Sequence, residues 1–312
     1  MVRTRIFYGT LLTLMALGVL LLDGVLARNW DASDASSVWQ RMLTLGGPGL
    51  MLVLSAGVLS TREFSRLLEL RNLRPLRSWT LLMVTALIVI PWLTVILIRD
   101  PAAAARADLQ WTLIALAVGV VGSSIALVLR RDASNGLADL GGAITAVVYL
   151  GLMFGFVVRL RMALPGPIGA WVVLMWIFVV KFTDVGAYFT GMAVGRRPLI
   201  PAISPKKTVE GSIGGLVVGI MTGVIAWSAL PIIRPVFEWG PIPSFAGLLI
   251  SAAAFSVLGQ FGDLIESLLK RSAAAKDSGA AIPTFGGILD VVDSLILTAP
   301  VAWILLAAWP AE

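Results

Sequence analysis

The chain of 312 residues contains neither cysteine nor histidine. The absence of cysteine excludes disulfides, thiolate metal sites and cysteine nucleophiles. The absence of histidine removes the side chain that most often carries protons near neutral pH. Any catalysis must therefore use carboxylates, hydroxyls, lysines, arginines or a bound metal.

Charged residues are also scarce, at 13% of the chain, whereas 58% of the residues are hydrophobic. Soluble globular proteins average about 25% charged and about 45–50% apolar residues. Apolar stretches long enough to cross the roughly 30 Å hydrocarbon layer recur from end to end. We therefore predict an all-α, polytopic integral membrane protein with about nine transmembrane helices. Their expected limits are residues 7–27, 43–61, 79–98, 109–129, 140–160, 169–190, 211–231, 245–269 and 288–309.

No segment between the predicted spans is long enough to form a separate soluble domain. We expect one integral membrane unit, in which residues 1–139 carry no recognisable motif and residues 140–312 form the candidate catalytic region. The start of the chain offers an alternative, because Arg3 and Arg5 precede an apolar run that ends in small residues, as a signal peptide does.

The net charge of +6 has a topological explanation. The basic residues occupy short loops between spans rather than one soluble face, so nucleic acid is not an expected partner. With the N-terminus in the cytoplasm, sixteen of the 24 lysines and arginines fall on the cytoplasmic side and seven on the other, while Lys181 lies within a span. The positive-inside rule favours this orientation.

Two polar clusters lie at the ends of the sixth and seventh predicted spans. Lys181 and Asp184 are three residues apart, so they share a helix face and either neutralise each other or contribute Asp184 to a site. The glycines that follow suit close helix packing. The run Ser204-Pro205-Lys206-Lys207-Thr208 then combines lysines and hydroxyls with the start of a helix, which suits phosphate groups. Ordinary positive-inside charge plus a helix cap is the alternative.

A third cluster lies between residues 259 and 293. Asp263 and Ser267 are four residues apart, which places them about 6 Å apart on one helix face, and Lys270 continues near that face. Asp290 and Asp293 form a second acidic face, joined to the first by a polar loop. Carboxylate and hydroxyl oxygens suit Mg²⁺, and nearby basic residues suit phosphate oxygens. Simple pairing of the acids with Lys270, Arg271 and Lys276 is the alternative, although ionisable groups at membrane depth are costly without a function.

In these residues the chain resembles the phosphatidate cytidylyltransferases, also called CDP-diacylglycerol synthases. The likeness covers about residues 180–300. It rests on the run from Asp184 to Tyr188, the run from Ser204 to Thr208, and a C-terminal signature matched by Ser267, Lys270-Arg271, Lys276-Asp277, Pro283, Gly286-Gly287, Asp290 and Asp293. Phe285 stands where the family usually has histidine, and Val291 where it usually has arginine. Losing an arginine from a phosphate-rich site is expected to alter substrate choice or rate.

The resemblance implies a nucleotidyltransferase that moves CMP from CTP to phosphatidate, giving CDP-diacylglycerol and pyrophosphate in phospholipid biosynthesis. It implies catalytic roles for Asp263, Asp290 and Lys270, and an Mg²⁺ site with Asp263, Ser267, Asp290 and Asp293 as ligands. Substrate binding would fall to Lys206, Lys207, Ser204, Thr208, Arg271, Asp184 and Lys276. The family also implies a cytoplasmic active site in a bacterial-type inner (cytoplasmic) membrane, and suggests a second cation such as K⁺ and a homodimer.

Two other functions compete with this interpretation. One is a divergent or inactive relative that binds lipid phosphate. The other is a cation-coupled membrane transporter, whose intramembrane acids would bind the ion. A transporter of this kind often has two similar halves with interrupted helices, and the sequence shows no convincing internal repeat.

Overall fold

The computed structural model describes residues 2–29, 38–131, 134–164, 166–237, 244–279, 281–282 and 286–307. Pro283 and Phe285 of the resemblance lie outside these ranges. The described elements, in chain order, are α1 (Val2–Asn29), α2 (Val38–Thr44), α3 (Gly47–Glu69), α4 (Arg77–Leu97), α5 (Pro101–Leu129), α6 (Gly136–Thr145), the π-helix η1 (Ala146–Leu152), α7 (Met153–Met162), α8 (Gly166–Val194), β1 (Pro198–Ile200), β2 (Ser204–Thr208), α9 (Val209–Phe237), α10 (Phe245–Ser272) and α11 (Leu289–Ala307).

The prediction of an all-α, polytopic membrane protein is confirmed, but the count of nine spans is not. Within the described residues, seven helical segments are long and apolar enough to cross a membrane, one of them formed by α6, η1 and α7 together. Counting the bent pair of α2 and α3 as one span gives eight. This pair turns by 69° at Gly46, whose φ of 81° lies in the left-handed region that glycine adopts without strain. Helix α1 covers the first predicted span but is not among the seven.

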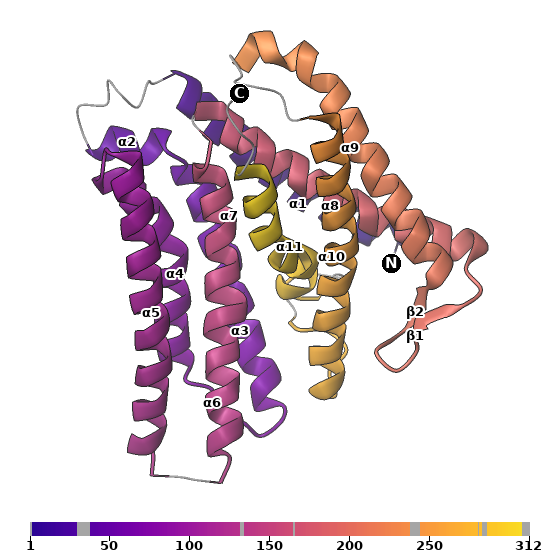
Figure 1. The fold of residues 1–312 in the computed structure, drawn as a ribbon. Coiled ribbons are helices and arrows are strands. Elements are labelled where there is room, and N and C mark those ends of the chain that lie inside the picture. The colour runs from indigo at the N-terminus through magenta and orange to yellow at the C-terminus, as the bar shows by residue number, and fades with distance from the viewer. Residues whose placement is uncertain are drawn as a thin grey trace.

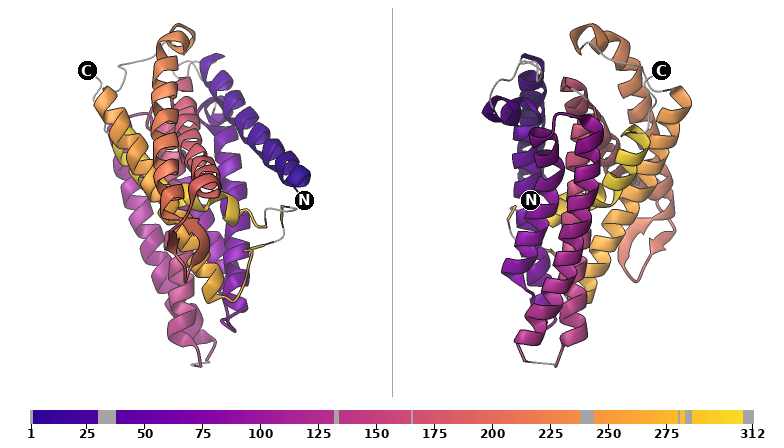
Figure 2. Two further views of the ribbon diagram at one scale, coloured as in Figure 1. Left: turned by 90° about the vertical axis from the view of Figure 1, so that its right-hand side faces the viewer. Right: turned by 60° about the vertical axis from the view of Figure 1, so that its left-hand side comes forward.

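The helices form one bundle with α11 near its middle (Figure 1). Helices α3, α4, α5 and α7 stand side by side, α8 crosses the molecule obliquely, and α1 is inclined against the upright helices (Figure 2). The α3–α4 and α5–α6 connections lie at the lower end in Figure 1, and the β1–β2 hairpin and the end of α10 point the same way. The bundle therefore brings the polar clusters predicted from the sequence to one end.

Two apolar cores hold this arrangement together. One surrounds Trp176 and Phe255, which join α8 and α10, and the other surrounds Ile88 and Leu150, which join α4 and η1. The indole N–H of Trp176 donates to the hydroxyl of Thr298 on α11 at 3.0 Å, so its one polar atom is satisfied at depth. Helix α11 is thereby fixed against α8 by both packing and a hydrogen bond.

The segment from Ser204 to Thr208, expected as a loop, is the second strand of a short antiparallel hairpin. Thr208 ends this strand, and its hydroxyl accepts a hydrogen bond from the Gly211 amide at 3.1 Å, which caps α9. A Cβ added at Gly211 would lie 2.8 Å from the Ala187 carbonyl oxygen of α8. The glycines here allow close packing of α8 against α9, as the sequence suggested.

Candidate active site

Three carboxylates converge where α10 meets α11. One carboxylate oxygen from each of Asp263, Glu266 and Asp293 lies within 4.8 Å of the others. Asp263 and Glu266 are three residues apart and share a face of α10, whereas Asp293 comes from the first turns of α11. Glu266 and Asp293 are buried and Asp263 is partly exposed, so the group opens on one side. We call these three residues the carboxylate group.

Gly262 permits this approach of the two helices. A Cβ at this position would lie 2.5 Å from the main-chain oxygen of Asp293 and 3.0 Å from Cα of Ser294. Because the obstacles are backbone atoms, no rotamer change could relieve them. The distance between α10 and α11 at the carboxylate group therefore depends on glycine.

We expect Gly262→Ala to destabilise the protein by about 1–3 kcal/mol, because overpacking forces the backbone to shift. Gly141→Ala is the matched control, since a Cβ there meets nothing within 4 Å and alanine favours the helix. Thermal melts of both variants in the same detergent test this expectation. A Gly262→Ala protein that melts with the control would contradict the tight contact.

A lysine from the hairpin reaches the open side of the carboxylate group. Lys207 Nζ lies 2.5 Å from Asp263 Oδ2, and both side chains are about one-third exposed. Lys206, the preceding residue, is exposed on β2. The alternation of strand side chains explains why two adjacent lysines have different surroundings.

Lys270 lies on the inner side of the carboxylate group, away from its open side. Its Nζ lies 2.6 Å from Glu266 Oε2 and 2.6 Å from Asp290 Oδ1. The other oxygen of Asp290 accepts hydrogen bonds from the amides of Ser278 and Gly287, at 3.0 and 2.7 Å. Asp290 therefore orients Lys270 and binds the main chain at two points of the α10–α11 connection, Ser278 and Gly287.

The carboxylate group differs from the predicted set of metal ligands. Asp263 and Asp293 belong to both, Glu266 was not predicted, and Asp290 lies beside the group, bound to Lys270. Ser267 is partly buried on α10, and its role stays a prediction. The sequence signal for Glu266 was present, because it lies one turn from Asp263, but the family signature drew attention to the serine instead.

Asp184 joins the site from α8. Its pairing with Lys181, considered from the spacing, is present at 3.3 Å. Ser294 links this pair to α11, since its hydroxyl donates to Asp184 at 3.1 Å and accepts from Lys181 at 2.8 Å. The amide of Ser294 also donates to Asp293 at 2.6 Å. Asp184 is thus both a partner of Lys181 and a neighbour of the carboxylate group.

Glu63 of α3 is a site residue that sequence reasoning missed. Its carboxylate accepts hydrogen bonds from the amides of Ile288 and Leu289, at 2.9 and 2.8 Å, and from the Ser278 hydroxyl at 3.2 Å. Leu289 is the first residue of α11, so Glu63 caps the helix that supplies Asp290 and Asp293. Its signal in the sequence was an acid just after the apolar segment predicted over 43–61.

Tyr149 is a second residue without a prior assignment. It lies in η1, and π-helical segments often occur at functional sites. Its buried hydroxyl has no hydrogen-bond partner among the described residues, and it interacts electrostatically with Asp293 and Glu266. The π-helix η1 therefore contributes a buried hydroxyl within electrostatic range of two members of the carboxylate group.

The donor set fits a divalent cation. Apart from the ion pair with Lys270, neither buried oxygen of Glu266 has a hydrogen-bond partner among the described residues. With all of its groups ionised, the site has a formal surplus of two negative charges. The five carboxylates are those of Asp184, Asp263, Glu266, Asp290 and Asp293, and the three ammonium groups are those of Lys181, Lys207 and Lys270. Hard oxygen ligands with this surplus suit Mg²⁺.

The remaining predicted substrate-binding residues lie around this centre in different settings. Arg271 and Lys276 are exposed near the end of α10 and in the following turn, whereas Ser204 is partly buried at the start of β2. The Thr208 hydroxyl is used as the α9 cap, as the alternative interpretation expected. Val291 is partly exposed in the first turn of α11, one residue from Asp290.

Comparison with known proteins finds similar sequences over most of the chain. The Cytidylyltransferase family model matches residues 37–309. Phosphatidate cytidylyltransferase of Bacillus subtilis is 38% identical over 169 residues, 54% of this chain and 59% of the relative. The Mycobacterium bovis enzyme of the same name is 35% identical over 56% of this chain and 53% of its own length. These matches thus span somewhat over half of the relatives. The phosphatidate cytidylyltransferase of Staphylococcus epidermidis is 29% identical over 83% of this chain and 90% of the relative.

Proposed function

The chain belongs to the cytidylyltransferase family, and on that premise we propose that it transfers CMP from CTP to phosphatidate. The products would be CDP-diacylglycerol and pyrophosphate, an activated lipid for phospholipid biosynthesis. The names of the similar bacterial proteins support this activity. The observation that carries it for this chain is the convergence of three carboxylates with Lys207 and Lys270 at the end of α10.

The proposed reaction is a single displacement at phosphorus. A phosphate oxygen of phosphatidate forms a bond to the α-phosphorus of CTP, and the bond from that phosphorus to the bridging oxygen of the β-phosphate breaks. Pyrophosphate leaves with the electron pair. The attacking oxygen is already anionic, so no strong general base is needed, and a chain without histidine can perform the step.

The main barrier is the repulsion between two anions, and the residues of the site would lower it by supplying and placing positive charge. Asp263, Glu266 and Asp293 would hold Mg²⁺, which when bound neutralises phosphate charge and aligns the reacting oxygens. Lys207 and Lys270 can exchange their carboxylate partners for phosphate oxygens. Asp290 would keep Lys270 in place. A second cation such as K⁺ and a homodimer stay predictions.

We place the site at the cytoplasmic face, where CTP is available. The sequence assigned seven basic residues to the opposite side, but Arg159 and Arg161 among them are buried in ion pairs with Asp108 and Asp23. The exposed positive charge is therefore more unequal between the two sides than the sequence count indicated. This supports an N-terminus and an active site in the cytoplasm.

Purified protein with labelled CTP and phosphatidate tests the activity directly. We expect a labelled liponucleotide and equimolar pyrophosphate in the presence of Mg²⁺, and neither product after chelation. Binding of phosphatidate without turnover would instead identify an inactive lipid-binding relative. Cation flux into liposomes without liponucleotide formation would identify a transporter.

The two hairpin lysines provide a further prediction. Lys207→Gln is expected to lower kcat/KM for CTP by about a hundredfold, because a charge-assisted contact contributes about 1.5–3 kcal/mol and each 1.4 kcal/mol is tenfold. Lys206→Gln, which removes the same charge from the exposed neighbour, should lower it only severalfold. Steady-state kinetics at saturating phosphatidate compare the two. Equal losses would contradict a specific role for the lysine beside Asp263.

A further inference from the structure

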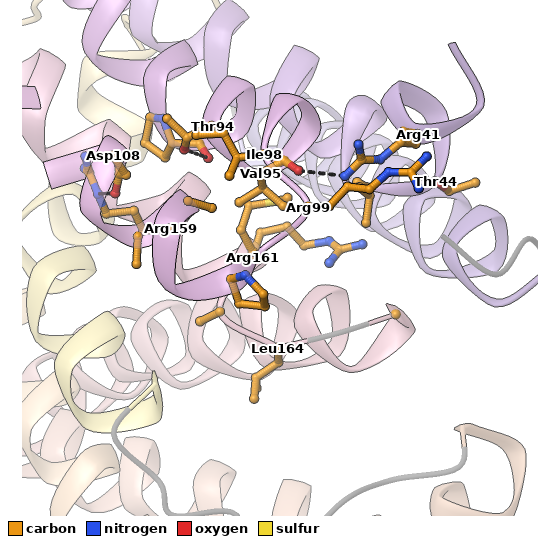
Figure 3. Close-up of a pocket in the computed structure, with 18 of the residues that line it drawn as sticks. Arg41, Thr44, Thr94, Val95, Ile98, Arg99, Asp108, Arg159, Arg161 and Leu164 are labelled. Carbon is orange, nitrogen blue, oxygen red and sulfur yellow. Dashed lines mark hydrogen bonds and ion pairs between the residues drawn. The ribbon is translucent and has the colours of Figure 1, made fainter. Parts of the chain in front are cut away.

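A cavity of about 640 Å³ lies at the opposite end of the bundle from the carboxylate group. It is bounded by α2, the end of α4, the start of α5, the end of α7 and Trp303 of α11 (Figure 3). Trp303 is 13 residues beyond Asp290 on the same helix, so the two are about 20 Å apart along its axis. The cavity is therefore separate from the candidate active site.

Four arginines line this cavity with a single carboxylate, that of Asp108. Arg159 binds Asp108 through two hydrogen bonds of 2.8 Å, and Arg161 pairs with the fully buried Asp23 just outside the lining. Arg41 donates to the main-chain oxygen of Val95 at 3.0 Å, and Arg99 has no carboxylate partner among the described residues. In Figure 3, Arg41, Arg99 and Arg161 gather on one side, while Arg159 lies beside Asp108. Among the described residues, Arg41 and Arg99 therefore bring positive charge to the cavity without a carboxylate partner.

Two of these guanidinium groups also carry buried donors without a partner. Arg159 and Arg161 are 8% and 7% exposed, and Nη1 of Arg159 and Nη2 of Arg161 have no hydrogen-bond partner among the described residues. A buried donor without a partner destabilises the folded protein, and it does so more strongly when it is charged. The guanidinium of Arg161 packs closely against Gly169 of α8, where an added Cβ would lie only 2.7 Å from Nη1. This close packing restricts the movement of the Arg161 side chain. The wall of the cavity therefore holds two fixed guanidinium groups, each with a buried N–H group that the described residues leave without a partner.

We propose that this cavity binds the phosphate group of an anionic phospholipid, in a site distinct from the catalytic one. Guanidinium groups recognise phosphate oxygens through paired hydrogen bonds, and they retain their charge at any physiological pH. The rest of the lining is mostly apolar and includes Leu164 and Trp303, which suits an acyl chain rather than a free ion. Arg99 and Ala105 at the rim are exposed, so the cavity opens to the surface.

Lipid binding to the purified protein tests this proposal. Phosphatidylglycerol is the anionic probe and phosphatidylcholine the neutral one, each counted by native mass spectrometry at matched concentrations. The test variant is the double replacement Arg41→Gln with Arg99→Gln, which leaves both buried ion pairs intact. Arg106→Gln is the matched control, because Arg106 is an exposed arginine of α5 outside the cavity lining.

We expect phosphatidylglycerol to bind the native protein and the Arg106→Gln control at least about tenfold more tightly than the double variant, the loss expected for one charge-assisted contact. Phosphatidylcholine should bind all three proteins equally. Equal loss of phosphatidylglycerol from the control and the double variant would overturn the proposal. Displacement of phosphatidylglycerol by millimolar inorganic phosphate would also overturn it, by assigning the cavity to the free anion. Melting temperatures in lipid-free detergent verify that the variants fold.

Discussion

Replacement of Asp293 by asparagine is expected to lower turnover by about a thousandfold while the protein remains folded. The substitution preserves volume, and the amide oxygen can still accept the hydrogen bond from Ser294 that Asp293 accepts at 2.6 Å. It removes one of three charges that converge within 4.8 Å. If the carboxylate group holds Mg²⁺, the loss of several kcal/mol of transition-state stabilisation corresponds to about three orders of magnitude in rate.

Liponucleotide formation at increasing Mg²⁺ concentration measures this effect. The native protein should saturate with Mg²⁺, whereas Asp293→Asn and Asp263→Asn should require much higher concentrations or show no turnover. Asp100→Asn is the control, because Asp100 is an exposed cap of α5 that asparagine can replace. Direct Mn²⁺ binding followed by electron paramagnetic resonance separates loss of metal from loss of chemistry. Native turnover and native metal affinity in Asp293→Asn would refute the assignment.

The structure and the sequence resemblance assign different roles to Asp290. The resemblance makes it a metal ligand, whereas its contacts with Lys270 and the Gly287 amide make it a positioning group. Asp290→Asn should therefore lower turnover through misplaced Lys270, with little change in Mn²⁺ affinity. Mn²⁺ titration of this variant against Asp293→Asn makes the comparison, and an equal loss of affinity would restore the ligand role.

The sequence predicted most of the fold because hydropathy marks membrane helices strongly. It also predicted that Asp263 and Asp293 would meet, since each lies at a polar end of an apolar segment. It did not single out Glu266, because only the packing of α11 against α10 brings this residue beside Asp293. The hairpin at Ser204–Thr208 was equally hidden, since its five residues have no alternating apolar pattern.

Contacts between segments far apart in the chain could not be predicted from local sequence patterns. Glu63 precedes its partners Ile288 and Leu289 by more than 220 positions, and nothing near it resembles a motif. The sequence count treated Arg159 and Arg161 as exposed charges between spans. In the structure they are buried in ion pairs with Asp108 and Asp23. In each case an ionisable residue close to the end of a span binds a residue of another helix and so holds the two helices together.

Glu63→Gln is expected to destabilise the protein by about 2–4 kcal/mol and to lower turnover at least tenfold, although Glu63 lies on α3. The carboxylate accepts from two amides and from Ser278, and an isosteric amide would turn an NH₂ group toward at least one of these donors. Each buried donor left unsatisfied costs about 1–3 kcal/mol. The start of α11 would then loosen, and with it the placement of Asp290 and Asp293.

Glu69→Gln is the matched control on the same helix, because Glu69 pairs with Arg77 at the surface. Exposed ion pairs contribute about 0–1 kcal/mol, so this variant should melt and turn over like the native protein. Hydrogen exchange at the Ile288 and Leu289 amides gives the local measurement, and both amides should exchange faster in Glu63→Gln alone. Because α3 belongs to the part of the chain without a recognisable motif, faster exchange together with reduced turnover would show that this part shapes the site. Unchanged exchange would mean that α11 keeps its start without Glu63, and the coupling between α3 and the carboxylate group would be wrong.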